Sequence, residues 1–76
     1  MIFTADHIRC LAKWCEDLHL IEYQTRLFEL YHNMSTGTKK ISTEEINSLC
    51  MTAIQVIRDN EKDKEMFYRT MNSWGL

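Results

Sequence analysis

The feature that most constrains the fold of this chain is the near absence of residues that interrupt helices. Proline does not occur among the 76 residues, and glycine occurs only at positions 37 and 75. A β-rich domain of this length needs several tight turns, which glycine and proline most often form. The sequence therefore predicts an all-α protein, in which the one clear loop is the polar segment at positions 35–40.

The clearest helix start follows Ile41. Ser42 is an N-cap candidate, and Glu45 is placed to complete a capping box by accepting a hydrogen bond from the Ser42 amide. Ile41 and Ile46 have the spacing of a hydrophobic staple across the same start. One face of this helix is apolar at steps of three and four residues, and we expect it to be buried. Its members are Ile46, Leu49, Cys50, Ala53, Val56 and Ile57.

The same periodicity divides the whole chain into four helical segments, at about 5–17, 20–34, 43–58 and 62–74. Thr4 is the N-cap candidate of the first segment, and Gly75 is a C-terminal stop. The eight polar residues 58–65 either continue the third helix as a solvated stretch or leave Asn60 to cap the last segment. The apolar face shifts by about 100° between the first two segments. Either the helix breaks between residues 17 and 21, or one long helix from residue 5 to residue 34 offers two faces; no helix-breaking residue decides between these alternatives.

The predicted fold is a small bundle of three to four helices in a single domain, residues 1–76. Two helical hairpins are one arrangement of it, because a pattern of cap and apolar residues recurs 38 positions later. The first copy is Phe3, Thr4, Ile8, Leu11, Ala12 and Cys15, and the second is Ile41, Ser42, Ile46, Leu49, Cys50 and Ala53.

Composition indicates the compartment. No stretch approaches the ~20 apolar residues of a membrane span, and residues 1–6 lack the basic region and apolar run of an export signal. The cysteines, Cys10, Cys15 and Cys50, are odd in number and have no secretory context. We therefore expect a cytoplasmic protein with three reduced thiols and no membrane partner.

Catalytic and metal-binding signatures are weak. His7, Cys10, Cys15 and His19 have helical spacings in pairs but do not share one face, and no Cys-x-x-Cys motif is present. Cys10 is the best nucleophile candidate because basic residues flank it, but no acid stands where it could orient a catalytic base. We predict no metal site, no cofactor and no enzymatic activity.

Nucleic-acid binding is an alternative with little electrostatic support. The nine basic residues are scattered through a chain of net charge −2. Glu44 and Glu45 stand at the helix end that would approach the bases, and only Lys39 and Lys40 are placed to contact phosphate.

Protein binding is favoured by a surplus of large side chains over what short helices readily bury. If residues 5–34 form one helix, then Trp14, Ile21 and Phe28 lie seven apart and form a narrow ridge. We take these three and Trp74 as the candidate partner-binding residues, because large aromatics dominate interface energetics when they are exposed. The competing interpretation is that they are the edges of wide core stripes.

The function we expect is a small non-enzymatic protein–protein interaction module that regulates a partner protein or inhibits it stoichiometrically. By analogy of size and character, a phage or another mobile element is one source of such a chain. The alternatives are a helical DNA- or RNA-binding regulator and a structural homodimer. The interaction hypothesis predicts that Trp14 or Trp74 is accessible to solvent.

Overall fold

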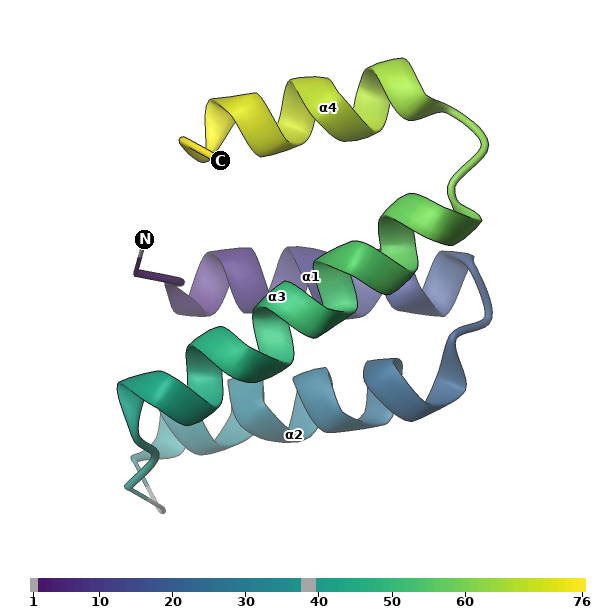
Figure 1. The fold of residues 1–76 in the computed structure, drawn as a ribbon. Coiled ribbons are helices and arrows are strands. Elements are labelled where there is room, and N and C mark those ends of the chain that lie inside the picture. Colours follow the sequence, from purple (N-terminus) through teal and green to yellow (C-terminus); the bar gives the residue numbers. More distant parts are fainter. Residues whose placement is uncertain (1, 38–39) are drawn as a thin grey trace.

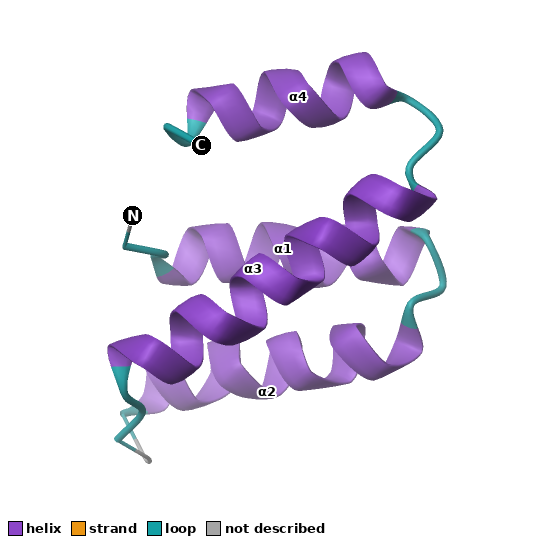
Figure 2. Ribbon diagram, viewed as in Figure 1, coloured by secondary structure: helices purple, strands orange, loops and turns teal. Residues whose placement is uncertain are grey.

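A computed structural model describes residues 2–37 and 40–76 of the chain. It contains four helices, α1 (Ala5–Asp17), α2 (Ile21–Thr36), α3 (Thr43–Asn60) and α4 (Lys64–Ser73), and the described residues form no strand (Figure 2). The all-α prediction is confirmed. Each helix begins and ends within two residues of the segment that the sequence predicted.

The helices form a thin bundle with extents of 36 × 26 × 17 Å. α1 and α2 run antiparallel as a hairpin, and α3 crosses both of them diagonally (Figure 1). α4 lies beside α1 on the side away from α2 (Figure 1). The closely packed pairs are α1 with α2, α1 with α3, and α2 with α3. The first of the two hairpins considered above is therefore formed, whereas α3 packs across that hairpin and α4 extends along α1.

The helix is interrupted between α1 and α2, although no glycine lies there. His19 adopts the left-handed conformation, with φ of 59°. The Leu20 amide donates to the Cys15 carbonyl at 2.8 Å and the His19 amide to the Glu16 carbonyl at 3.1 Å. These two bonds are the Schellman motif, which satisfies the last carbonyls of a helix. Histidine is one of the few non-glycine residues enriched in this conformation, so two separate helices form instead of one long helix.

The helix starts carry the expected caps. The Thr4 hydroxyl accepts from the His7 amide at 3.2 Å, and the His7 ring accepts from the Thr4 amide at 3.2 Å, which closes a capping box. The Ser42 hydroxyl accepts from the Glu45 amide at 3.1 Å. The return bond from the Ser42 amide to the Glu45 side chain, which the sequence predicted, is not formed between these two described residues. The Glu45 carboxylate lines a groove instead.

Of the two alternatives for residues 58–65, the structure shows a helix that continues to Asn60. Asn60 does not start α4 but is the last residue of α3, where its side-chain amide donates to the Val56 carbonyl at 2.8 Å. The N-cap of α4 is Asp63, whose carboxylate accepts from the Met66 amide at 3.0 Å. The polar residues after Ile57 stay helical to Asn60 because they lie on the solvated side and need no apolar partner.

The core draws side chains from all four helices. The apolar residues at helical spacing in the first segment are Ile8, Leu11, Ala12, Cys15 and Leu18; the first four are fully buried, and Leu18 is half-buried. Cys50, Ala53 and Ile57 of α3 are fully buried as well, and Ile54, which the sequence pattern did not select, joins them at 7% exposure. Among the described residues no polar or charged side chain belongs to the buried core. Burial of apolar surface is therefore the main force that holds the helices together.

Within residues 2–37 and 40–76, no helix combines the length and the apolar content needed to cross a bilayer.

Candidate functional site

Trp14 is a core residue and not a ridge residue. It is 9% exposed, its ring packs against Phe67 with centroids 5.6 Å apart, and its indole N–H donates to the Glu61 carboxylate at 2.7 Å. This hydrogen bond lowers the pKa of Glu61, because it stabilises the carboxylate form. Trp14 therefore attaches α4 and the end of α3 to α1. Its proposed place on an exposed ridge is corrected, since that ridge required a continuous helix through residue 19.

The other three candidate residues do not form one surface with it. Phe28 on α2 and Trp74 after α4 are half-buried and pack against the core, and the Trp74 ring lies 4.6 Å from the His7 ring. Ile21 is 62% exposed at the start of α2. Because α2 and α4 lie on opposite sides of α1 (Figure 1), Trp74 is separated from the two α2 residues. Phe28 and Trp74 fit the competing interpretation, in which they are the margins of core stripes.

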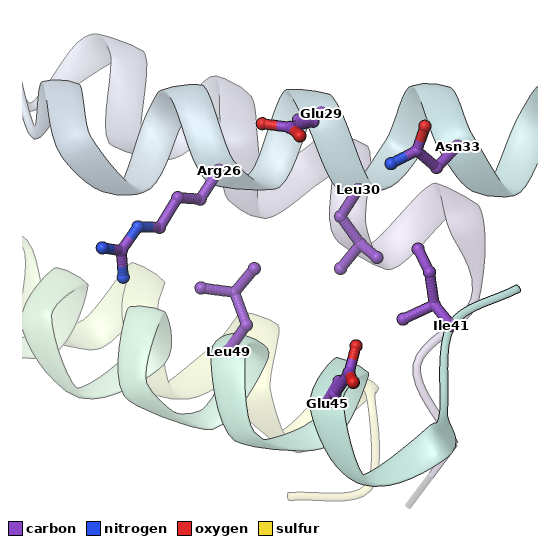
Figure 3. Close-up of a pocket in the computed structure, with 7 residues that line it drawn as sticks. All are labelled: Arg26, Glu29, Leu30, Asn33, Ile41, Glu45 and Leu49. Atoms are coloured by element: carbon purple, nitrogen blue, oxygen red, sulfur yellow. The ribbon is translucent and has the colours of Figure 1, made fainter. Parts of the chain in front are cut away.

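A groove between α2 and α3 is the site that the sequence did not reveal. Near the loop that joins the two helices it encloses about 300 Å³ (Figure 3). There it is lined by Arg26, Glu29, Leu30, Asn33, Ile41, Glu45 and Leu49. Farther from the loop it encloses about 440 Å³ and is lined by Tyr23, Arg26, Glu44, Glu45, Ser48, Leu49 and Thr52. Both parts share Arg26, Glu45 and Leu49, so they form one continuous feature, which we name the α2–α3 groove.

The groove results from the diagonal path of α3. The small side chains of Cys50 and Ala53 are fully buried in the middle of α3, where they let the helix cross closely over the α1–α2 hairpin. α3 starts beside the end of α2 and moves away from it toward α1 along its length (Figure 1). The larger volume accordingly lies at the end remote from the loop.

The interior of the groove is apolar. Leu30 from α2 and Leu49 from α3 both point into it, and Ile41 closes the end near the loop (Figure 3). Leu30 is 7% exposed, whereas Leu49, Ile41 and Tyr23 are only half-buried. The apolar spacing of the second and third segments includes Tyr23, Leu30 and Leu49, and of these three only Leu30 is buried. The charged residues next to these apolar positions in the sequence were the available indication that the positions are partly exposed.

The walls of the groove are acidic. Glu29, Glu44 and Glu45 are exposed, and none of them forms an ion pair with another described residue. The one base, Arg26, is paired with Glu22 at 2.9 Å, so much of its charge is already compensated. The acids therefore determine the potential at the groove, which is negative.

Covalent chemistry has little support in this arrangement. The groove lining contains neither cysteine nor histidine. Burial raises the pKa of Cys10, and it raises the pKa of Cys15 and of Cys50 to about 11, which disfavours the nucleophilic thiolate at neutral pH. Within residues 2–37 and 40–76 no group of three or more His, Cys, Asp or Glu side chains is placed to hold a metal ion. Lys39 lies outside the described residues, and Lys40 is exposed.

A second hollow lies between α1 and α4. It encloses about 320 Å³ and is lined by Cys10, Lys13, Trp14, Asp17, Glu61, Met66 and Thr70. One of its lining residues is Trp14, which belongs to the buried core.

Comparisons of the chain with protein-family models, with curated proteins and with solved structures find no match. The function is therefore argued from the geometry of the molecule.

Proposed function

We propose that this protein is a small non-enzymatic interaction module that holds a segment of a partner protein in the α2–α3 groove. By occupying that segment it would regulate the partner or inhibit it stoichiometrically. The observation that carries the proposal is an apolar groove with half-exposed Leu49 and Tyr23, which no other helix covers, since α4 packs on the far side of α1.

The physical reason is the free energy of covering that surface. Removing apolar area from water is favourable by about 25 cal/mol per Å², and this gain is available to a partner that fits between α2 and α3. The lining adds carboxylates, an amide and hydroxyls, which orient a ligand and limit which partner binds. Without a cysteine, a histidine or a deep enclosed cavity, the groove favours binding over catalysis.

The cytoplasm is the proposed location, and it is supported by three free thiols. A phage or mobile-element origin remains a prediction from the size and character of the chain.

A structural homodimer is the second candidate, because several large apolar side chains lie in solvent. They are Ile2, Ile21, Met51, Met66, Tyr68 and Leu76. Light scattering over a wide concentration range separates the two candidates, since a constant dimer mass supports self-association and a constant monomer mass supports a foreign partner. Nucleic-acid binding is less favoured, because Arg58 is paired with Asp59 and Arg69 with Glu65.

The groove is tested with one blocking variant and one matched control. Ser48 is exposed on the groove wall in α3, and Thr25 is exposed on α2 outside the lining. Ser48→Arg places a long charged side chain in the groove, and Thr25→Arg makes the same change elsewhere. Tagged full-length proteins are used to isolate partners from cytosol, and each captured protein is then purified and its binding stoichiometry is measured by calorimetry.

We expect one captured protein to bind wild type and Thr25→Arg at a ratio of one to one and to lose binding to Ser48→Arg. Equal binding to all three, or capture of nothing by wild type, would overturn the proposal.

A further inference from the structure

We infer that the partner segment held in the α2–α3 groove is an amphipathic helix whose apolar face is flanked by lysine or arginine. This inference rests on the proposed function and adds the chemical class of the ligand. It is carried by the shape of the groove, the absence of backbone groups that could pair with a ligand, and the charge of the walls.

The backbone of the groove favours a helical ligand over an extended one. An extended peptide leaves its own N–H and C=O groups unpaired and normally satisfies them on a sheet edge. Both walls of this groove are helices whose backbone groups are already paired within the helix, and the described chain offers no strand. A polyproline ligand requires a groove lined by several aromatic rings, but Tyr23 is the single aromatic residue here. A helical segment satisfies its own backbone and needs only side-chain contacts.

The length of the groove indicates the length of the ligand. On α2 its lining runs from Tyr23 to Asn33, ten positions apart, which corresponds to about 15 Å of helix. A ligand helix of about three turns spans that distance. Its apolar residues, repeated every three or four positions, would lie against Leu30 and Leu49.

The charge of the groove walls comes from three carboxylates, those of Glu29, Glu44 and Glu45, which form no ion pair with another described residue. α2 and the first half of α3, up to Thr52, carry four glutamates and one arginine. The loop between the two helices adds Lys39 and Lys40, so residues 21–52 carry four acids and three bases. The positive end of the α3 dipole lies at this face, but Glu44 and Glu45 in its first turn exceed its partial charge. Bases on the flanks of the ligand complement these unpaired carboxylates, whereas acids there are repelled.

The inference is tested with two designed peptides of about 14 residues, each held helical by a side-chain crosslink, a length that covers the three turns estimated above. Both carry leucines at positions spaced by three and four. The flanking positions are lysine and arginine in one peptide and glutamate in the other. Affinity is measured by fluorescence anisotropy at low and at physiological salt, and the binding site is mapped by amide chemical-shift changes on the full-length protein.

We expect the cationic peptide to bind about tenfold or more tightly than the anionic one, because three exposed charge pairs each contribute modestly. The preference falls as salt increases. Shift changes are expected at residues that line the groove, Leu30 and Leu49 included.

Two sets of neutralised variants identify the acids responsible. Combined replacement of Glu29, Glu44 and Glu45 by glutamine removes the preference for the cationic peptide while keeping the fold, because all three are exposed. A control with the same change of charge, combining Asp6→Asn, Asp59→Asn and Glu65→Gln on other faces of the molecule, keeps it.

The inference is overturned if both peptides bind equally, if neither binds, or if the shift changes fall on the hollow between α1 and α4. It is also overturned if light scattering finds a dimer whose interface covers the groove. In the three peptide outcomes, loss of partner binding by Ser48→Arg still supports the proposed function, so the two failures are distinguishable. A dimer whose interface covers the groove overturns the proposed function as well.

Discussion

Truncation of Trp14 tests whether this residue holds the core together or belongs to a surface for a partner. Its side chain is 91% buried, packs on Phe67 and donates a hydrogen bond to Glu61. Replacing such a tryptophan by alanine leaves a large cavity and costs about 3–5 kcal/mol of folding free energy. A domain of 76 residues has about 4–11 kcal/mol of stability in total, so Trp14→Ala removes a large part of it.

The matched control is Ile21→Ala, at the residue that shared the predicted ridge with Trp14. Ile21 is 62% exposed, so its truncation is expected to change stability by about 0.5 kcal/mol or less. The assay is urea denaturation followed by circular dichroism at 222 nm. With a slope of about 1 kcal/mol per molar for a small domain, the midpoint of Trp14→Ala falls by several molar or the variant is already unfolded in water.

The milder variant Trp14→Phe keeps a ring at this position and loses the indole N–H. It is expected to fold, with a midpoint between those of wild type and Trp14→Ala. The assignment of Trp14 to the core would be refuted if Trp14→Ala and Ile21→Ala shifted the midpoint equally. It would also be refuted if Trp14→Ala lowered the free energy of unfolding by less than about 1 kcal/mol.

Three further predictions follow from local features. His19 has φ of 59°, a conformation that glycine adopts without a steric cost. His19→Gly is therefore expected to raise the free energy of unfolding by up to about 1 kcal/mol and to raise the urea midpoint accordingly. A lower midpoint would contradict this prediction. The pKa of Glu61 is lower in the folded state than in the unfolded state, so its contribution to stability is present above the unfolded pKa and is lost as pH falls through the folded pKa. Trp14→Phe lacks the indole N–H, so its thermal midpoint should decrease less on acidification than that of wild type. Titration of the native protein with a thiol reagent at neutral pH should modify Cys10 and spare the other two cysteines until urea is added, because those two are fully buried; fast modification of all three in the native state would contradict their burial.

The helix boundaries were predictable because they are encoded by residues close in sequence. Thr4 and Ser42 satisfy the first free amides of their helices, and Gly75 ends α4 in the left-handed conformation, with φ of 83°. The spacing of apolar residues then identified the buried face of α1 without knowledge of its neighbours.

The break at His19 was not predictable in the same way. A non-glycine residue in the left-handed conformation gives no compositional signal, and Leu20 reads as a good helix former. The break is stabilised by the two backbone bonds of the Schellman motif and by the packing of Leu20 on the core, which requires the hairpin that the break itself creates. Tertiary packing therefore decided between the two alternatives that the sequence left open.

The site was missed for a related reason. The position of Trp14 on a helical wheel lies at the margin of the α1 stripe, and a marginal residue is buried or exposed according to what packs beside it. α4 packs there, so Trp14 is covered by Phe67, and Trp74 packs on His7 in a second ring contact. Leu49 is a marginal residue too, and it stays half-buried because it faces the α2–α3 groove.

The position of α4 therefore determines which of the large side chains are buried and which stay exposed. α1 offers α4 two aromatic partners, His7 and Trp14, and the ring contacts to Trp74 and Phe67 draw α4 to the side of α1 that is remote from α2. Had α4 packed between α2 and α3, its apolar face would have covered the surface now open at Leu49 and Tyr23. The acids on the groove walls would repel α4 less strongly than an acidic ligand, because α4 carries both acidic and basic residues. The open groove is thus a consequence of aromatic packing at α1, and a foreign helix with its own apolar face can take the place that α4 leaves free.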